Sequence, residues 1–351
     1  MRLSTVLRSA QWACVASLLA LAQCRIIILV MGNQYYASIE AANGVVHGTP
    51  HWVVVQSRVL APYTIALLTG LFGQFSSAHE VFTLATLAIA GYMVLALTWR
   101  RFGSDASWGA FFLFQMLLCL LSNKYWLYAW DQYDIIIFIL FADFVLSGKD
   151  WRWFIVLFAV GIFNRESALF ISLWMILDPL AKALLDRGRA IRRLDWRMLA
   201  AGLGTMGVGL GIVYALRSIL LVREIGPELF HDSSRAGKWI SQYGVPDNIE
   251  FLQKVLSHPK SGVVILFFPV VVVGLAFAML LRDPRRYSAF AATQLAMIGG
   301  IMMVGLWDET RVMLDSVPFV VMAFCVLRAK PVVDQRSASM ARSNETPKFH
   351  A

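Results

Sequence analysis

The chain has 351 residues, of which 58% are hydrophobic and only 15% are charged, and its net charge is +9. Soluble domains are about 25% charged and about 45–50% apolar, so this composition argues against a soluble protein and indicates a membrane protein with many spans. The basic residues are scattered in short loops between apolar runs, which is typical of the positive-inside bias and argues against a nucleic-acid partner.

Apolar runs of spanning length are found along most of the chain. They are residues 10–31, 80–99, 106–122, 198–222, 262–281, 288–307 and 312–328, with shorter runs at 59–73, 135–147, 152–163 and 167–181. The first run is interpreted as a retained span that also serves as the targeting signal. Irregular backbone cannot face lipid, so each span should be helical.

The basic residues decide the topology. If residues 59–73 form an outer juxtamembrane helix rather than a span, 20 of the 31 Lys and Arg residues fall on the cytoplasmic side. The prediction is therefore an all-α polytopic membrane bundle of about ten transmembrane helices with both termini cytoplasmic. Residues 1–328 form one transmembrane domain with outer loops at 32–79 and 223–261, and residues 329–351 form a disordered cytoplasmic tail.

This topology brings charged residues of separate loops to the outer side. They are Glu40 and Arg58 of the first loop, Asp131 and Asp134 of NKYWLYAWDQYD, and Glu309 and Arg311 of WDETR. The aromatic residues of NKYWLYAW are most simply interpreted as an interfacial belt. The four cysteines lie in apolar runs without metal-binding spacing, so they are expected to be small packing residues.

The stretch GIFNRESALF places Asn164, Arg165 and Glu166 between two short apolar runs. Asn164 suits the N-cap of the following helix, and Glu166 in its first turn suits the helix dipole. Arg165 has no such local role. Arg165 and Glu166 each need a partner from another outer loop, and the candidates are Asp131, Asp134, Glu309 and Arg311. Arginine binds phosphate through a planar fork, and carboxylates bind sugar hydroxyls or remove their protons, so this group indicates a lipid-linked phosphosugar as ligand.

The order of these pieces resembles the multispanning bacterial glycosyltransferases of the C fold, which include lipid-phosphosugar-dependent mannosyl- and arabinosyltransferases. The matching pieces are NQYYASIEAANG, RVLAPYTIALLTGLFG, VFTLATLAIAGYMVLALTWRRFG, NKYWLYAWDQYD and GIFNRESALF. The resemblance covers roughly residues 10–181, with a weaker similarity at 305–320. It implies inverting transfer of a sugar from a polyprenyl-phosphate donor to an acceptor on the outer side, with a carboxylate base.

The chain departs from that family at the place of the base. The family usually has an aspartate soon after the first span, where this chain has Asn33 and Gln34. Neither amide can act as a base. Either Glu40 takes the role, or a carboxylate from another loop takes it, or the protein is not a transferase.

In the transferase interpretation Glu40 is the base, and the remaining candidates bind phosphate or substrate. These are Arg58, Arg165, Glu166, Asp131, Asp134, Glu309 and Arg311. The expected partners are membrane lipid and the lipid-linked sugar donor, and the expected location is the bacterial inner membrane. A divalent metal ion is compatible with the carboxylates but is not indicated, no other cofactor is indicated, and the sequence does not specify an oligomeric state.

Two other interpretations stay open. A transporter or flippase for a lipid-linked or anionic substrate would use the same arginines and carboxylates without chemistry. A non-catalytic membrane protein of envelope assembly would need neither the missing aspartate nor large outer loops.

Overall fold

The computed structural model describes residues 3–48, 57–122, 127–186, 194–220, 245–257, 263–304 and 310–329. Within these ranges every regular element is a helix, which confirms the predicted all-α class. Six of the described helical segments are long and apolar enough to cross a membrane. They are Val6–Met31, Phe75–Phe102, Ser104–Leu121, Glu166–Leu185, Trp196–Leu216 and Thr310–Arg328.

The described ranges contain thirteen α-helices and two short 3-10 helices. The first α-helices are α1 (Leu3–Met31), α2 (Asn33–His47), α3 (Leu60–Phe72), α4 (Phe75–Phe102), α5 (Ser104–Leu121), α6 (Ala129–Ser147) and α7 (Trp151–Gly161). The others are α8 (Leu169–Leu185), α9 (Trp196–Leu220), α10 (Val245–Ser257), α11 (Val263–Arg282), α12 (Pro284–Val304) and α13 (Val317–Arg328). The 3-10 helices are η2 (Glu166–Ala168) and η6 (Thr310–Ser316).

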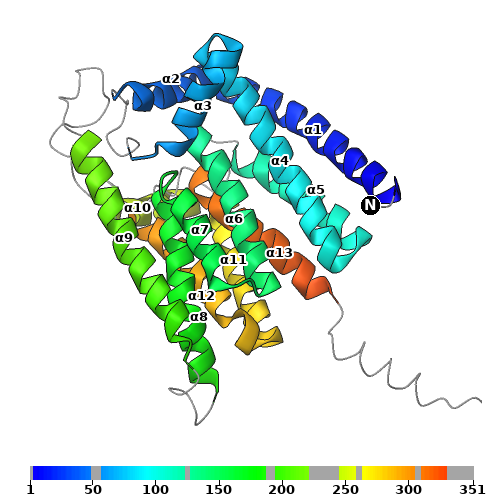
Figure 1. Ribbon diagram of the computed structural model, residues 1–351, viewed down its shortest axis with the longest axis vertical. Helices are drawn as coiled ribbons and strands as arrows, with labels where there is room; N and C mark the ends of the chain where they lie inside the picture. The colour runs from blue at the N-terminus through cyan, green and yellow to red at the C-terminus, as the bar shows by residue number, and fades with distance from the viewer. Residues whose placement is uncertain are drawn as a thin grey trace, which may run out of the picture.

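Helices α1, α4 and α5 run side by side along one flank of the bundle, and α2 and α3 lie across one end of it (Figure 1). Helix α6 packs against α4, α7 and α13, so it lies between this flank and the remaining helices. Every apolar run that was predicted as a span overlaps one α-helix, and the run 59–73 contains α3.

The outer loops are more helical than the sequence predicts. Residues 33–47 form α2, and α4 begins at Phe75, so much of the predicted loop 32–79 is helix. Helix α10 lies within the predicted loop 223–261. The other residues of that loop, 223–244 and 258–261, lie outside the described residues. So does the predicted tail 329–351 apart from its first residue.

Aromatic packing fixes α6 at the centre of the bundle. The ring of Phe141 on α6 meets Phe154 of α7, Trp174 of α8 and Phe290 of α12, with ring centroids 6.1, 5.9 and 5.8 Å apart. All three contacts have the edge-to-face geometry that aromatic rings prefer. These contacts hold α6 in place against α7, α8 and α12, and they thereby position the polar residues of its first turn.

One end of the bundle is held by arginines. Arg101, near the C-terminus of α4, forms an ion pair of 2.8 Å with Asp143 near the C-terminus of α6. Arg286 of α12 donates a hydrogen bond of 3.0 Å to the carbonyl oxygen of Leu146 on α6. The last turns of α4 and α6 therefore meet the first turn of α12.

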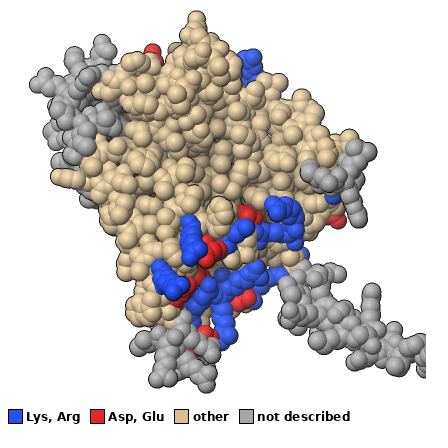
Figure 2. All heavy atoms as spheres, in the orientation of Figure 1, with Lys and Arg blue, Asp and Glu red and all other residues tan. Residues whose placement is uncertain are grey.

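The same end includes α8, α11 and α13. Arg285 of α12 pairs with Asp186 after α8 at 3.1 Å, and Arg282 of α11 donates to the carbonyl oxygen of Leu327 on α13 at 2.9 Å. Figure 2 shows Lys and Arg gathered at the lower end of the view, below a broad face on which uncharged residues dominate. We call this end, which contains Arg101, Arg282, Arg285 and Arg286, the basic end.

Candidate functional site

The first turn of α6, at the end of the bundle opposite to the basic end, is polar and buried. Tyr128 is the N-cap residue, and its backbone N–H donates to Asp131 Oδ2 at 3.0 Å in a capping box. Asp131 and Asp134 are three positions apart, so they lie on the same face of the helix. Both side chains are almost fully buried, which requires partners for both carboxylates.

Arg165 supplies one partner from the turn between α7 and α8. Its Nη1 lies 3.1 Å from Asp131 Oδ1, 3.6 Å from Asp134 Oδ2 and 3.6 Å from Asp315 Oδ2. Burial by itself lowers the pKa of the Arg165 guanidinium, but the carboxylates of Asp315, Asp131 and Asp134 outweigh burial and raise the pKa. The guanidinium therefore stays charged between three carboxylates.

Arg58 and Glu166 form a second ion pair beside the first. Arg58 Nε lies 3.9 Å from Glu166 Oε2, and Ser57 Oγ donates to Glu166 Oε1 at 3.1 Å. Burial lowers the pKa of Arg58, and Glu166 opposes that effect. Residues 57 and 58, which precede α3, therefore contact the turn between α7 and α8, which we call the NRES turn (residues 164–167).

Arg311 connects the C-terminal part of the chain to α6. Its Nη1 lies 3.5 Å from Asp131 Oδ2, and its guanidinium carbon lies 4.7 Å from the ring centroid of Tyr128. Thr310, the preceding residue, donates from Oγ1 to the carbonyl oxygen of Leu121 at 2.5 Å. This hydrogen bond attaches η6 to the end of α5.

The interpretation of NKYWLYAW as an interfacial aromatic belt is wrong for its described residues Tyr128 and Trp130. Their rings stack at 4.4 Å, and the side chains are buried. The guanidinium of Arg58 lies 5.2 Å from the Trp130 ring, and that of Arg311 lies over Tyr128. The two rings are buried because they pack against buried cations and shield them from water.

Asn164 does not have the predicted role of helix cap. Its Nδ2 donates to the carbonyl oxygen of Trp130 at 2.8 Å and to Asp134 Oδ1 at 2.6 Å. The N-cap position of η2 is held by Arg165, and no side chain caps η2 or α8. A buried Asp134 needs hydrogen-bond donors, and Ser167 Oγ supplies another at 2.8 Å.

Together these residues form what we call the polar cluster, which consists of Arg58, Asp131, Asp134, Asn164, Arg165, Glu166, Ser167, Arg311 and Asp315. Within the described chain, several buried polar atoms in and beside it have no hydrogen-bond partner: Arg58 Nε, Trp130 Nε1, Asn164 Oδ1, Asp315 Oδ1 and Ser316 Oγ. Most buried polar groups in proteins are paired, so this concentration indicates a place for water or a polar ligand.

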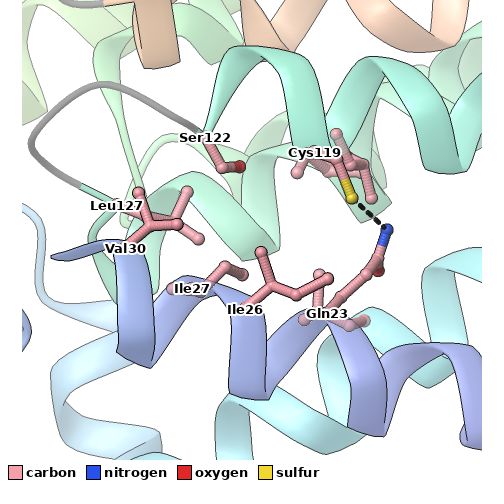
Figure 3. A pocket seen from close by; sticks show the side chains of 10 residues that line it. Gln23, Ile26, Ile27, Val30, Cys119, Ser122 and Leu127 are labelled. Carbon is pink, nitrogen blue, oxygen red and sulfur yellow. Dashed lines mark hydrogen bonds between the residues drawn. The ribbon is translucent and has the colours of Figure 1, made fainter.

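An apolar pocket with an empty volume of about 420 Å³, its open mouth included, is lined by residues of α1, α4, α5 and α6. Figure 3 shows Ile26, Ile27 and Val30 of α1 facing it, and the Gln23 amide reaching Cys119 of α5. The other lining residues are Leu87, Leu118, Ser122, Leu127 and Ile135.

The lining of the pocket continues directly into the cluster along the chain. Leu127 precedes Tyr128, and Ile135 follows Asp134. Ser122 follows Leu121, whose carbonyl oxygen accepts the hydrogen bond from the residue before Arg311. The pocket and the polar cluster thus share the start of α6 and the end of α5.

Six predicted site residues meet in the polar cluster, namely Arg58, Asp131, Asp134, Arg165, Glu166 and Arg311. Glu309 lies outside the described residues. Glu40 is exposed on α2, and the ion pairs between described residues of the cluster do not include it. Its role as a base therefore stays a prediction.

Asp315 is the main residue that the sequence prediction missed. It stands four positions after Arg311 in the apolar stretch RVMLDSVPFVV, where a buried carboxylate is costly and therefore a candidate functional residue. In the described part of the chain, no group of three or more His, Cys, Asp or Glu residues is arranged to hold a metal ion.

Comparison with known proteins adds no relative. A scan against protein-family models, a search of curated proteins and a search of solved structures each return no match for this chain.

Proposed function

We propose that the chain is an integral membrane glycosyltransferase that moves a sugar from a polyprenyl-phosphate donor to an acceptor on the outer side of the bacterial inner membrane. The observation that carries the proposal is the polar cluster, in which three largely buried arginines and four carboxylates meet, with an apolar pocket lined by residues next to the cluster along the chain. A polyprenyl-phosphate sugar has the matching parts, since its tail is apolar, its phosphate is anionic and its sugar carries hydroxyls.

The arginines act on the leaving group. Arg58, Arg165 and Arg311 hold the phosphate through charge-assisted hydrogen bonds, and the carboxylates of Asp131 and Asp134 hold sugar hydroxyls. A carboxylate base takes the proton of the acceptor hydroxyl, whose oxygen forms a bond to the sugar C1 while the bond from C1 to the phosphate oxygen breaks. The polyprenyl phosphate leaves with the electron pair, and the preorganised guanidinium groups stabilise its charge.

The proposal includes an orientation in the membrane. Ten helices cross it, namely α1, α4, α5, α6, α7, α8, α9, α11, α12 and α13. The basic end faces the cytoplasm together with both termini, while α2 and α3 lie at the outer surface. The arginines of the basic end support this orientation, because loops rich in Lys and Arg stay on the cytoplasmic side.

Binding of undecaprenyl phosphate to the purified chain tests the donor site. Native mass spectrometry should show about tenfold weaker binding for Arg58→Lys and Arg311→Lys, equivalent to about 1.4 kcal/mol, because lysine keeps the charge but loses the planar fork. Arg152→Lys is the matched control, since Arg152 is exposed near the basic end. Equal affinity of all three variants and the wild type would contradict the assignment.

Transfer itself is tested in the source organism. Deletion of the gene should remove a sugar from the surface glycans, and the wild-type chain should restore it, as measured by mass spectrometry of the glycans. Unchanged glycans in the deletion strain, with undecaprenyl phosphate moved across proteoliposome membranes, would instead support a flippase.

A further inference from the structure

Asp315 differs from the other carboxylates of the polar cluster in its surroundings. It lies on η6, and its side chain is 6% exposed. Its Oδ2 lies 3.6 Å from Arg165 Nη1, whereas its Oδ1 has no hydrogen-bond partner among the described residues. One oxygen is therefore held near a guanidinium, and the other is buried without a hydrogen-bond donor in the described chain.

The two aspartates of the polar cluster on α6, Asp131 and Asp134, have both carboxylate oxygens occupied. Asp131 Oδ1 pairs with Arg165, and its Oδ2 accepts from the Tyr128 backbone and lies near Arg311. Asp134 accepts on Oδ1 and on Oδ2 from neutral side chains of the NRES turn. Each oxygen of these two carboxylates already has a donor, so neither is placed to take a proton, although each oxygen can accept a second hydrogen bond from a sugar hydroxyl.

The surroundings of Asp315 also contain unpaired polar atoms that a substrate could satisfy. Within the described ranges, Ser316 Oγ and Asn164 Oδ1 are buried and have no hydrogen-bond partner. Asp315 shares the Arg165 guanidinium with Asp131 and Asp134. Arg311 lies on the same 3-10 helix as Asp315, η6. A hydroxyl that donates to Asp315 Oδ1 would thus lie close to the arginines that face the phosphate.

We propose that Asp315 is the catalytic base of the transfer reaction, in the role that the sequence assigned to Glu40. This assignment rests on the proposed function. The acceptor hydroxyl gives its proton to Asp315 Oδ1, its oxygen bonds to the sugar C1, and the C1–O bond to the phosphate breaks. The negative charge passes from Asp315 to the leaving polyprenyl phosphate, and Arg165 contacts the base and neutralises the phosphate.

The test uses membranes of the deletion strain, which supply donor and acceptor, and the purified full-length chain. Product is measured by mass spectrometry for the wild type, Asp315→Asn and Asp315→Ala, with and without formate. Loss of a general base should lower the product rate by about 100-fold or more. Formate should raise the product rate of Asp315→Ala at least about tenfold over the rate of the same variant without formate. It can occupy the space of the missing carboxylate and accept the proton.

Two controls separate catalysis from structure. Asp105→Asn, an exposed carboxylate next to the basic end, should keep the wild-type rate. Undecaprenyl phosphate should bind Asp315→Asn with an affinity within about threefold of the wild type, since Asp315 contacts the acceptor rather than the donor phosphate.

The outcomes are distinguishable. A rate for Asp315→Asn close to the wild type overturns the assignment. A loss of rate that formate does not reverse, or that accompanies loss of undecaprenyl phosphate binding, also overturns it because the carboxylate is then structural. A wild-type chain that yields no product contradicts the proposed function itself.

Discussion

Arg165 is the residue on which the polar cluster depends most. It is the only residue described here that contacts Asp131, Asp134 and Asp315 through one nitrogen, and its side chain is 11% exposed. Desolvation of a charge costs several kcal/mol, so a buried ion remains stable only with close partners. Removal of Arg165 would leave three buried carboxylates without their shared cation.

Replacement of Arg165 by alanine should lower the free energy of unfolding by about 3–5 kcal/mol, the range expected when one partner of a buried ion pair is lost. The effect is measured by thermal unfolding in detergent. Arg152→Ala, at an exposed position, should change stability by no more than about 0.5 kcal/mol. Similar unfolding temperatures for both variants would show that the cluster is solvated.

Asn164→Asp separates the predicted role of Asn164 from the observed one. Aspartate is as good an N-cap as asparagine, so a capping role predicts no change. The observed amide donates to Asp134 and to the Trp130 carbonyl, and a carboxylate can do neither. We expect a loss of about 1–3 kcal/mol, since buried acceptors then lack donors. A neutral substitution would restore the capping interpretation.

The sequence predicts the cluster only in part, and the reason lies in distance along the chain. That Arg165 needs a carboxylate follows from the cost of burying a charge, and two of the three candidate carboxylates, Asp131 and Asp134, contact it, while Glu309 lies outside the described residues. The roles of Asp315 and of the Tyr128 ring depend on η6 packing against α6, across 180 positions in the case of Arg311 and Asp131. Local patterns carry no information about such a contact.

At the scale of elements, close packing of α8 on α9 brings backbones together at glycine. A Cβ at Gly202 of α9 would lie 2.9 Å from Ile176 Cγ1 and 3.0 Å from the Ile176 backbone nitrogen. Small residues at helix interfaces allow this approach within membranes. A Cβ at Gly204 would meet nothing within 4 Å, which makes it a matched control.

Gly202→Ala should therefore destabilise the protein by about 1–3 kcal/mol, because the backbone of α8 has to move. Gly204→Ala should be neutral or stabilising by up to about 1 kcal/mol, since alanine favours a helix more than glycine does. Both are measured by thermal unfolding in the same detergent. An unchanged stability of Gly202→Ala would mean that α8 and α9 are farther apart than the structure places them.

The helix α2 shows how a helical pattern can be missed. Its buried residues include Tyr35, Ser38, Ile39, Ala42 and Val45, a spacing that is typical of one helical face. The prediction placed this segment in an outer loop because it lies between two apolar runs, residues 10–31 and 59–73. Packing on α3 and α4 stabilises the helix, and short helices receive most of their stability from such packing.

At the scale of the whole molecule, the basic end and the polar cluster lie at opposite ends of the bundle, as the predicted topology requires. The C-terminal end of α6 belongs to the basic end, and its N-terminal turn belongs to the cluster. The absolute orientation follows from the proposal that the basic end is cytoplasmic.

Cysteine labelling in intact cells tests that orientation. In a background without Cys14 and Cys119, which are exposed, Ser76→Cys should react with a membrane-impermeant maleimide, and Lys149→Cys should not. Ser76 lies near the start of α4 and Lys149 lies beyond the end of α6, at opposite ends of the bundle. After permeabilisation both should react, and the reverse pattern in intact cells would invert the topology.

The arginines of the basic end also cap helices. Arg286 donates to the carbonyl of Leu146 in the last turn of α6, and Arg282 donates to the carbonyl of Leu327 in the last turn of α13. The last carbonyls of a helix have no partner within it, so these contacts complete its backbone hydrogen bonding. The charges that would direct insertion into the membrane thus also stabilise the ends of α6 and α13 in the folded protein. Substitutions that neutralise Arg282 and Arg286 to change the orientation would therefore also remove hydrogen bonds from these two helix ends.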